Sequence, residues 1–199
     1  MKKVYLIMTL VCMMMVSCKP DSATGKHEGY EYIDLGLSVK WATCNVGASS
    51  PEEYGEYFAW GETSAKETYI EKNSITYGKP MSDISGNAQY DAARANWGGD
   101  WRMPTYNELK ELMTSCTMKW TKQKGVNGYK VEGPNGNSIF LPATAYHYSS
   151  QSGWGGGFYW SSTPSGGDYA YSFYFYGDAN LIEDDGGRYY GYSVRPVLK

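Results

Sequence analysis

Hydrophobic and polar residues alternate along several short stretches of this chain, at the period of half-buried β-strands. In the N-terminal part the alternation predicts strands over residues 30–35, 38–44 and 57–60. Further along the chain, the same pattern predicts strands over residues 129–132, 138–141, 158–162, 169–176 and 192–198. The Asn135-Gly136 pair is typical of a hairpin turn, so we expect residues 129–132 to pair with residues 138–141.

Two helices are predicted between these groups of strands. Residues 89–96 are rich in alanine and are followed by Gly98-Gly99, a pair that ends helices. A second helix begins at Thr105, which forms a capping box with Glu108. Its apolar positions share one face: Tyr106, Leu109, Leu112 and Met113. The polar stretch 61–86 has little periodicity and is expected to be a long surface loop.

Two short helices followed by a run of antiparallel strands predict an α+β domain. Because successive side chains of a strand face opposite ways, the strand 169–176 is expected to have one inward and one outward face. The inward set is Tyr171, Phe173 and Phe175. The outward set is Ser172, Tyr174 and Tyr176. Residues 177–187 are acidic and polar, and we expect them to form a loop beside the outward tyrosines.

The N-terminus has the pattern of an export signal. Lys2 and Lys3 precede an apolar run over residues 4–16 that is too short to span a membrane. The run ends at Ser17-Cys18, which resembles the lipobox of bacterial lipoproteins, whose cysteine receives the lipid. Ordinary cleavage after a small residue is the alternative. We therefore expect a signal over residues 1–17, a lipidated tether over residues 18–29 beginning at Cys18, and one domain over residues 30–199.

The charge and composition of the chain limit the classes of partner that it is expected to bind. The formal net charge is −3 and becomes −5 when Lys2 and Lys3 leave with the signal. There is no basic stripe, so nucleic acid is not an expected partner. Ten of the 20 tyrosines lie in residues 146–199, among glycine, serine and asparagine. That mixture is typical of recognition surfaces, although tyrosine also favours buried strands.

Two cysteines remain in the mature chain. Cys44 and Cys116 are an even pair in an exported protein, and a disulfide between them is the default expectation. Two buried free thiols are the alternative, because the sequence does not show the distance between them.

Four strings in the same order resemble a known family: DLGLSVKWATCNVG at 34–47, WGGDWRMPT at 97–105, YWSS at 159–162 and GYSVRPV at 191–197. Together they resemble the Fibrobacter succinogenes major paralogous domain, which is common in exported lipoproteins of gut Bacteroidetes. The resemblance covers nearly all of the chain after residue 30. It implies a C-type lectin-like fold with two helices, N- and C-terminal strands in one sheet, and a loop-rich face for ligands. It implies no activity, because the family has no established one.

Catalytic and metal chemistry have little support. His27 and His147 stand alone, and no spacing suggests a triad or a metal cluster. The RMPT string at 102–105 and the SVR string at 193–195 also resemble the wider C-type lectin-like group that includes formylglycine-generating enzymes. Those enzymes use a cysteine pair near their C-terminus, and this chain has no cysteine after Cys116. The acidic residues of 177–187 are either a solvated loop or a set of oxygens for Ca²⁺. Arg102 and Arg195 are read either as structural residues or as anion ligands.

These observations predict a non-catalytic outer-membrane lipoprotein that binds a glycan or a protein, with no cofactor and no metal. The alternative is a structural component of an envelope complex without a small ligand. The residues expected to contact the ligand are Trp154, Tyr174, Tyr176, Asp178, Asn180, Tyr189 and Tyr190.

Overall fold

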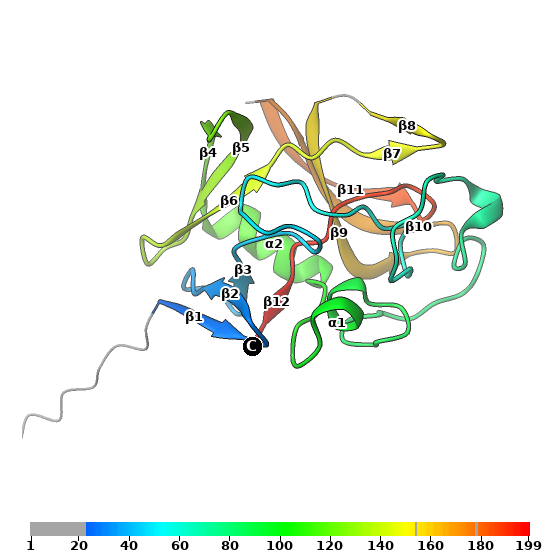
Figure 1. The fold of residues 1–199 in the computed structure, drawn as a ribbon, viewed down its shortest axis with the longest axis horizontal. Helices are drawn as coiled ribbons and strands as arrows, with labels where there is room; N and C mark the ends of the chain where they lie inside the picture. The colour runs from blue at the N-terminus through cyan, green and yellow to red at the C-terminus, as the bar shows by residue number, and fades with distance from the viewer. Residues whose placement is uncertain (1–22, 154, 178) are drawn as a thin grey trace, which may run out of the picture.

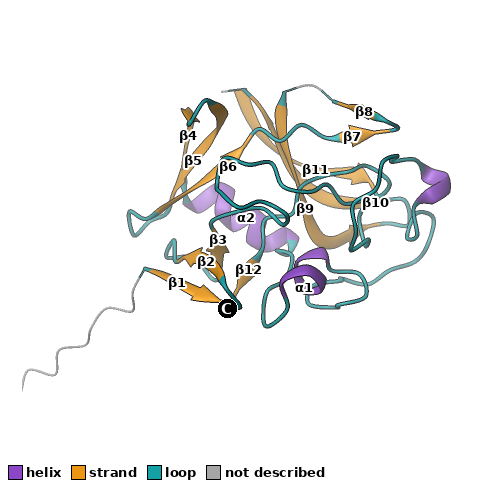
Figure 2. Cartoon of the chain, viewed as in Figure 1, coloured by secondary structure: helices purple, strands orange, loops and turns teal. Residues whose placement is uncertain are grey.

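The computed structural model, shown as a ribbon in Figures 1 and 2, describes residues 23–153, 155–177 and 179–199. The helical elements are η1 (Glu71–Asn73), α1 (Ala92–Trp97) and α2 (Tyr106–Ser115). The strands are β1 (Thr24–His27), β2 (Tyr30–Ile33), β3 (Lys40–Ala42), β4 (Thr117–Gln123), β5 (Val126–Glu132), β6 (Ser138–Pro142), β7 (His147–Tyr148), β8 (Gln151–Ser152), β9 (Gly156–Ser165), β10 (Tyr169–Tyr176), β11 (Ala179–Gly187) and β12 (Val197–Leu198). Neighbouring strands within the four small sheets are antiparallel, which confirms the predicted α+β class.

The first and last strands of the chain share a sheet of order β1-β2-β3-β12. Val197 pairs with Trp41, and Leu198 pairs with Lys40. Residues 24–27, which we expected to belong to a tether, form β1 in this sheet. The side chain of His27 accepts a hydrogen bond from the Asp100 amide at 3.0 Å, and its carbonyl accepts one from Trp101 Nε1 at 2.9 Å. The tether prediction is therefore wrong for residues 24–27, because distant residues hold them in place.

The sheet β11-β10-β9 separates two hydrophobic cores. Phe158 and Trp160 of β9 point into a tryptophan-rich core, whose other large members are Trp60, Trp97, Trp101 and Tyr192. Tyr159 of the same strand points the opposite way, into an aliphatic core. That second core is formed with α2, β5 and β6 and contains Leu109, Leu112, Val131, Leu141, Phe173 and Phe175. Both faces of the central sheet are thus covered by apolar side chains.

The strand β10 has the predicted bounds, and its alternation is partly as expected. Phe173 and Phe175 are fully buried in the aliphatic core, as predicted. Ser172 was expected to point outward but is also buried, because the tryptophan-rich core covers that face. Tyr174 is half-buried and stacks on Phe158, whereas Tyr176 is exposed. The outward face of β10 becomes accessible only at its C-terminal end.

The helix α2 begins as its sequence predicts. Thr105 Oγ1 accepts a hydrogen bond from the Glu108 amide, and the Glu108 carboxylate accepts one from the Thr105 amide, which completes the capping box. The other helix, α1, begins later than residue 89, because the buried Asp91 caps it by accepting from the Arg94 amide. It ends at Gly98 as expected.

Three other expectations need correction. Residues 57–60 do not form a strand, and Phe58 makes only an isolated bridge to Tyr192. Residues 177–187 are not a loop, since Ala179–Gly187 pairs with β10 along its length. The stretch 61–86 is irregular as expected, but it is not only a surface loop, because Tyr69, Thr76 and Ile84 are buried.

Candidate functional site

A group of tyrosine rings lies near the β7–β8 hairpin, which is at the opposite end of the molecule from β1 in Figure 1. Tyr148 of β7 contacts two consecutive tyrosines of the segment after β11, with ring centroids 6.0 Å from Tyr189 and 5.5 Å from Tyr190. Tyr77 meets Tyr189 edge-on at 5.2 Å. These four residues, Tyr77, Tyr148, Tyr189 and Tyr190, are called the tyrosine surface below.

A hollow of about 360 Å³ opens beside two rings of the tyrosine surface. Tyr148 and Tyr189 line it, together with Ile70, Glu71 and Lys72 at η1. The two rings are inclined at 53° to one another, and 49 % of Tyr148 is exposed. Glu71 and Lys72 are also exposed. The hollow therefore offers two aromatic rings, one carboxylate and one ammonium group to a ligand.

Backbone hydrogen bonds fix the walls of this hollow relative to each other. The hairpin tip is tied to the segment before η1, because the Tyr69 amide donates to the Ser149 carbonyl at 2.9 Å and the Ser149 amide returns a bond of 2.8 Å. His147 and Gly191 exchange two bonds of 2.9 Å in the same way. A Cβ at Gly191 would lie 2.7 Å from the Tyr69 ring, so only glycine permits this close approach. Three segments distant in sequence thus form one rigid wall.

Arg188 holds the base of the tyrosine surface. It is fully buried, and its guanidinium lies 4.3 Å from the centre of the Trp60 ring. It donates to four backbone carbonyls, those of Tyr169, Thr76, Lys79 and Gly166. Burial lowers the pKa of this guanidinium from its ordinary value, but the carbonyls and the aromatic face stabilise the cation. Since Tyr189 follows Arg188 directly, this anchor sets where its ring lies.

Arg102 and Arg195 are structural residues. The Arg102 guanidinium binds both oxygens of Glu108, at 2.8 and 2.6 Å, and hydrogen bonding to that carboxylate raises the arginine pKa. Arg195 is buried and donates to Asn45 Oδ1 at 2.8 Å and to three carbonyls. Neither guanidinium is left to bind an anion.

Four of the predicted ligand-binding residues belong to one connected group of rings. Tyr189 and Tyr190 are part of the tyrosine surface, and Tyr189 borders the hollow. Tyr174 and Tyr176 lie further away and are linked to Tyr190 through Phe158, by way of either Tyr192 or Tyr146. The structure therefore brings the first pair to a hollow and leaves the second pair outside it. Trp154 and Asp178 lie outside the described residues, and of Asn180 only the backbone is described, in β11.

Sequence reasoning missed the other residues around the hollow. Tyr148 had a signal, since it lies in the tyrosine-rich C-terminal region between His147 and Ser149. No sequence pattern predicted the three residues at η1, because the pairing of Tyr69 with Ser149 brings them to the hollow: Ile70, Glu71 and Lys72.

The aspartates of β11 bind groups of the protein itself. Asp184 accepts hydrogen bonds from the Asp185 amide at 2.8 Å and from the Tyr174 hydroxyl at 3.5 Å. Asp185 accepts one from the Ser165 hydroxyl at 2.8 Å. Among the described residues, no group of three or more His, Cys, Asp and Glu side chains is placed to hold a metal ion.

The expected disulfide is not formed, and that prediction is wrong: Cys44 and Cys116 are both free thiols. Cys44 follows β3, with its sulfur 3.6 Å from Thr43 Oγ1, and lines a hollow together with Tyr30 and Trp97. Cys116 follows α2 and packs against the aliphatic core. Burial, and secondarily Glu111, raises the pKa of the Cys116 thiol to about 11. The two thiols have different surroundings because Cys44 follows β3, beside Tyr30 and Trp97, whereas Cys116 follows α2 at the aliphatic core.

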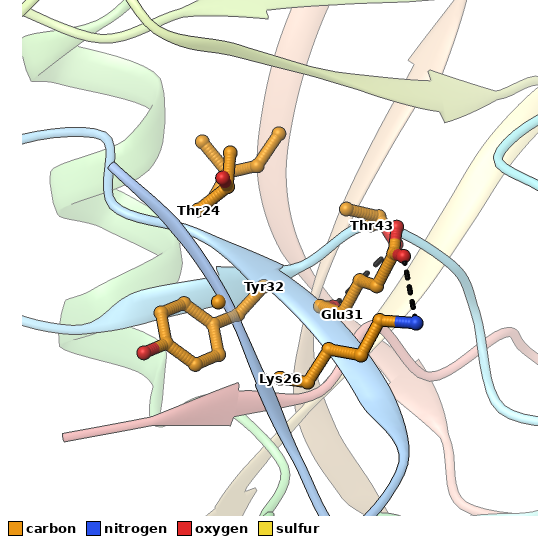
Figure 3. Close-up of a pocket in the computed structure, with 7 residues that line it drawn as sticks. Thr24, Lys26, Glu31, Tyr32 and Thr43 are labelled. Atoms are coloured by element: carbon orange, nitrogen blue, oxygen red, sulfur yellow. Dashed lines mark hydrogen bonds and ion pairs between the residues drawn. The ribbon is translucent and has the colours of Figure 1, made fainter. Parts of the chain in front are cut away.

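A second hollow, of about 340 Å³, lies over β1 and β2 and is shown in Figure 3. Lys26 and Glu31 extend toward each other there and form an ion pair of 3.2 Å between Nζ and Oε1. Both side chains are more than half exposed, so water and salt weaken their attraction. The charges of Lys26 and Glu31 neutralise each other, and Tyr32 is the one aromatic residue that lines this hollow. This hollow is a weaker candidate for a ligand than the one beside the tyrosine surface.

Neither α1 nor α2 has the length and apolar character to cross a membrane, and the rest of the described chain has no such helix either. Comparison with models of known protein families found no match, and comparisons with curated proteins and with solved structures found none either.

Proposed function

We propose that this chain is a non-catalytic binding module of the cell envelope that recognises a glycan through the hollow beside the tyrosine surface. The observation that carries the proposal is the pair of rings, Tyr148 and Tyr189, lining a hollow of about 360 Å³. The faces of tyrosine rings stack well on the C–H faces of sugars, while the hydroxyls stay accessible to polar partners. Large exposed aromatic groups gathered in one place are typical of interaction sites.

The shape and charge of the hollow favour a short neutral glycan. Small ligands bind in concave sites of roughly 300–1,000 Å³, whereas a protein partner covers roughly 800 Å² on each side. The rim carries Glu71 and Lys72, one charge of each sign. Such a rim accepts and donates hydrogen bonds to hydroxyl groups without attracting a strongly charged chain.

The sequence resemblance supports the same function. The Fibrobacter succinogenes major paralogous domain implies a C-type lectin-like fold with a loop-rich ligand face. Two helices and the pairing of β12 with β3 agree with that implication. Family membership and the finer fold remain part of the proposal.

A lack of catalysis is supported by the surroundings of the two histidines. His27 accepts a hydrogen bond from the Asp100 amide and is occupied in holding β1. The His147 ring packs on Tyr57 at 4.2 Å, and burial lowers its pKa. No carboxylate, thiol or hydroxyl nucleophile is paired with either ring within the described residues.

We further propose that Cys18 carries a lipid and that the protein is attached to the outer membrane. Cys18 lies outside the described residues, but the chain enters the fold at β1, at the far end from the β7–β8 hairpin (Figure 1). A tether at β1 would therefore present the tyrosine surface away from the bilayer. A Cys18→Ala variant should lose its lipid and leave the membrane fraction. If that variant stays in the membrane fraction after a high-salt wash, the lipoprotein proposal is wrong.

Glycan binding is tested with the purified mature protein in detergent on an array of neutral and acidic glycans, followed by calorimetry of the positives. Replacing Tyr148 or Tyr189 with alanine should weaken binding at least about tenfold, since a lost stacking contact of about 1.4 kcal/mol has that effect. Tyr169→Ala is the matched control, because Tyr169 is 48 % exposed but does not line the hollow.

Two outcomes would contradict the proposal. One is a wild-type protein that binds no glycan on the array. The other is a pair of folded hollow variants that bind as tightly as the wild-type protein and the Tyr169→Ala control.

A further inference from the structure

Among the described strands, β4 and β11 are the longest that have an edge without backbone partners. β4 ends the sheet β4-β5-β6, and β11 ends the sheet β11-β10-β9. Apart from the ladders within these sheets, no backbone hydrogen bond of the described chain reaches β4, and the only one that reaches β11 is at its last residue, Gly187. By contrast, the far edge of β9 is bonded to Ser193. An open edge is a template on which another strand can add.

The two open edges carry opposite charges. On β4, Lys119 and Lys122 are exposed, whereas Lys124 in the following turn is paired with Glu52 at 3.4 Å. On β11, Asp184 and Asp185 are exposed. Lys119 lies directly opposite Lys130 on β5, whose ammonium group is paired with the Glu132 carboxylate at 2.7 Å. Lys119 and Lys122 therefore give the β4 edge a positive charge, and the two aspartates give the β11 edge a negative one.

We propose that copies of this chain associate edge to edge, with β4 of one copy adding to β11 of the next. The two strands have similar lengths, seven and nine residues. The Asp185 amide is already bonded to the Asp184 carboxylate, so the added strand pairs with the part of β11 before these residues. The two aspartates then flank the contact and face the lysines of the incoming strand.

Charge decides which edges pair. Two copies of β4 would bring lysines together, and two copies of β11 would bring aspartates together, so both like pairings are disfavoured. Only the unlike pairing brings opposite charges into contact. Because the contact joins two different surfaces, each copy keeps one edge of each kind free, and the assembly grows as an open row.

Association in a row would place several tyrosine surfaces side by side. A ligand with repeated units would then bind more than one copy, and each further contact would occur at a high effective concentration. The association itself does not depend on glycan binding, since neither β4 nor β11 lines the hollow.

The test is sedimentation velocity of the purified mature protein over a range of concentrations, at low and at high salt. The average sedimentation coefficient of the wild type should rise with concentration at low salt and fall back at high salt, because salt screens the charges. Two double variants reverse one edge each, Lys119→Glu with Lys122→Glu and Asp184→Lys with Asp185→Lys. Each should sediment as a monomer when alone. An equimolar mixture of the two should associate again, since an acidic and a basic edge then meet.

The matched control is Lys72→Glu with Lys79→Glu, which changes the net charge as much as the β4 variant but alters neither edge. It should associate like the wild type. The proposal is overturned if the wild type stays monomeric at every concentration or if the β4 variant alone associates normally. It is equally overturned if the mixture does not associate, or if the control loses association as fully as the edge variants. Circular dichroism and thermal unfolding establish that each variant is folded before it is compared.

Discussion

The C-terminal region places chemically similar aromatic side chains in two different surroundings. On β10, Phe173 and Phe175 are completely buried between the central sheet and α2. A short distance along the chain, Tyr189 and Tyr190 are only half-buried, and they meet the 49 % exposed Tyr148 beside an open hollow. The first group contributes to folding, and the second is free to contact a ligand. The covering elements, rather than the residue types, determine this division.

The largest effect is expected from a single truncation in the buried group. Phe175→Ala should lower the free energy of unfolding by about 3–5 kcal/mol, because it leaves a cavity beside Tyr129 and Trp120. Tyr176→Ala, at the neighbouring and 44 % exposed position, should cost less than about 1 kcal/mol. Urea unfolding of both variants measures the difference. Equal losses would mean that the two faces of β10 are not distinct.

A smaller effect is expected where the tyrosine surface is anchored. Arg188→Lys should lower the free energy of unfolding by about 2–3 kcal/mol, since one ammonium group cannot satisfy the four carbonyls that the guanidinium binds. The exposed Lys72→Arg is a control for the charge-preserving exchange. Thermal and urea unfolding give the two values. If Arg188→Lys is as stable as the wild type, the anchoring role is wrong.

The Arg102–Glu108 pair next to α2 should make the stability of the buried region depend on acid pH. Burial opposes ionisation of Glu108, but bonding to Arg102 and to the Thr105 amide outweighs it and lowers the pKa of the carboxylate. A lowered folded-state pKa adds stability that is fully present above the ordinary glutamate pKa of about 4.3 and is lost as pH falls through the lowered value.

Glu108→Gln removes this titration. Urea unfolding from pH 7 to pH 3 should show a stability gap between wild type and variant that is constant above about pH 5 and narrows below it. A gap that stays constant down to pH 3 would contradict the role of the ionised pair.

The smallest effect on stability is expected at the tyrosine surface itself. Tyr148→Ala should change the free energy of unfolding by less than about 1 kcal/mol, because half of the side chain is already in water. The same variant should bind glycan poorly, so stability and binding separate at this position. A loss comparable to that of Phe175→Ala would show that Tyr148 belongs to the core.

Local signals in the sequence predicted the local features of the fold. The Thr105–Glu108 capping box, the hairpin at Asn135-Gly136 and the bounds of β10 depend on residues near one another, and all are confirmed. The strand β11 was missed because its acidic and glycine residues disfavour strands, and only pairing with β10 makes it one. β1 was also missed because it depends on distant residues: Asp100 and Trp101 donate hydrogen bonds to His27 of this strand.

The candidate site was predictable only in part. Tyr189 and Tyr190 were found because tyrosine-rich sequence points to recognition, whereas the partners that turn them into a hollow depend on contacts across long separations. Lys72 lies at the hollow because Tyr69 pairs with Ser149. Neither the segment around Tyr69 nor the segment around Ser149 has a sequence pattern that predicts this pairing. Composition can therefore suggest that a surface exists, but it cannot delimit it.

The pairing of β12 with β3 has a practical consequence for building chimaeras. Because Leu198 lies in the same sheet as β1, a fluorescent protein fused after Lys199 would be placed near the point where the chain enters the fold (Figure 1). The β7–β8 hairpin at the other end would remain unobstructed. Joining the two ends with a short linker and opening the chain in the turn after Gln123 would, by the same geometry, give a circular permutant that keeps the hollow intact.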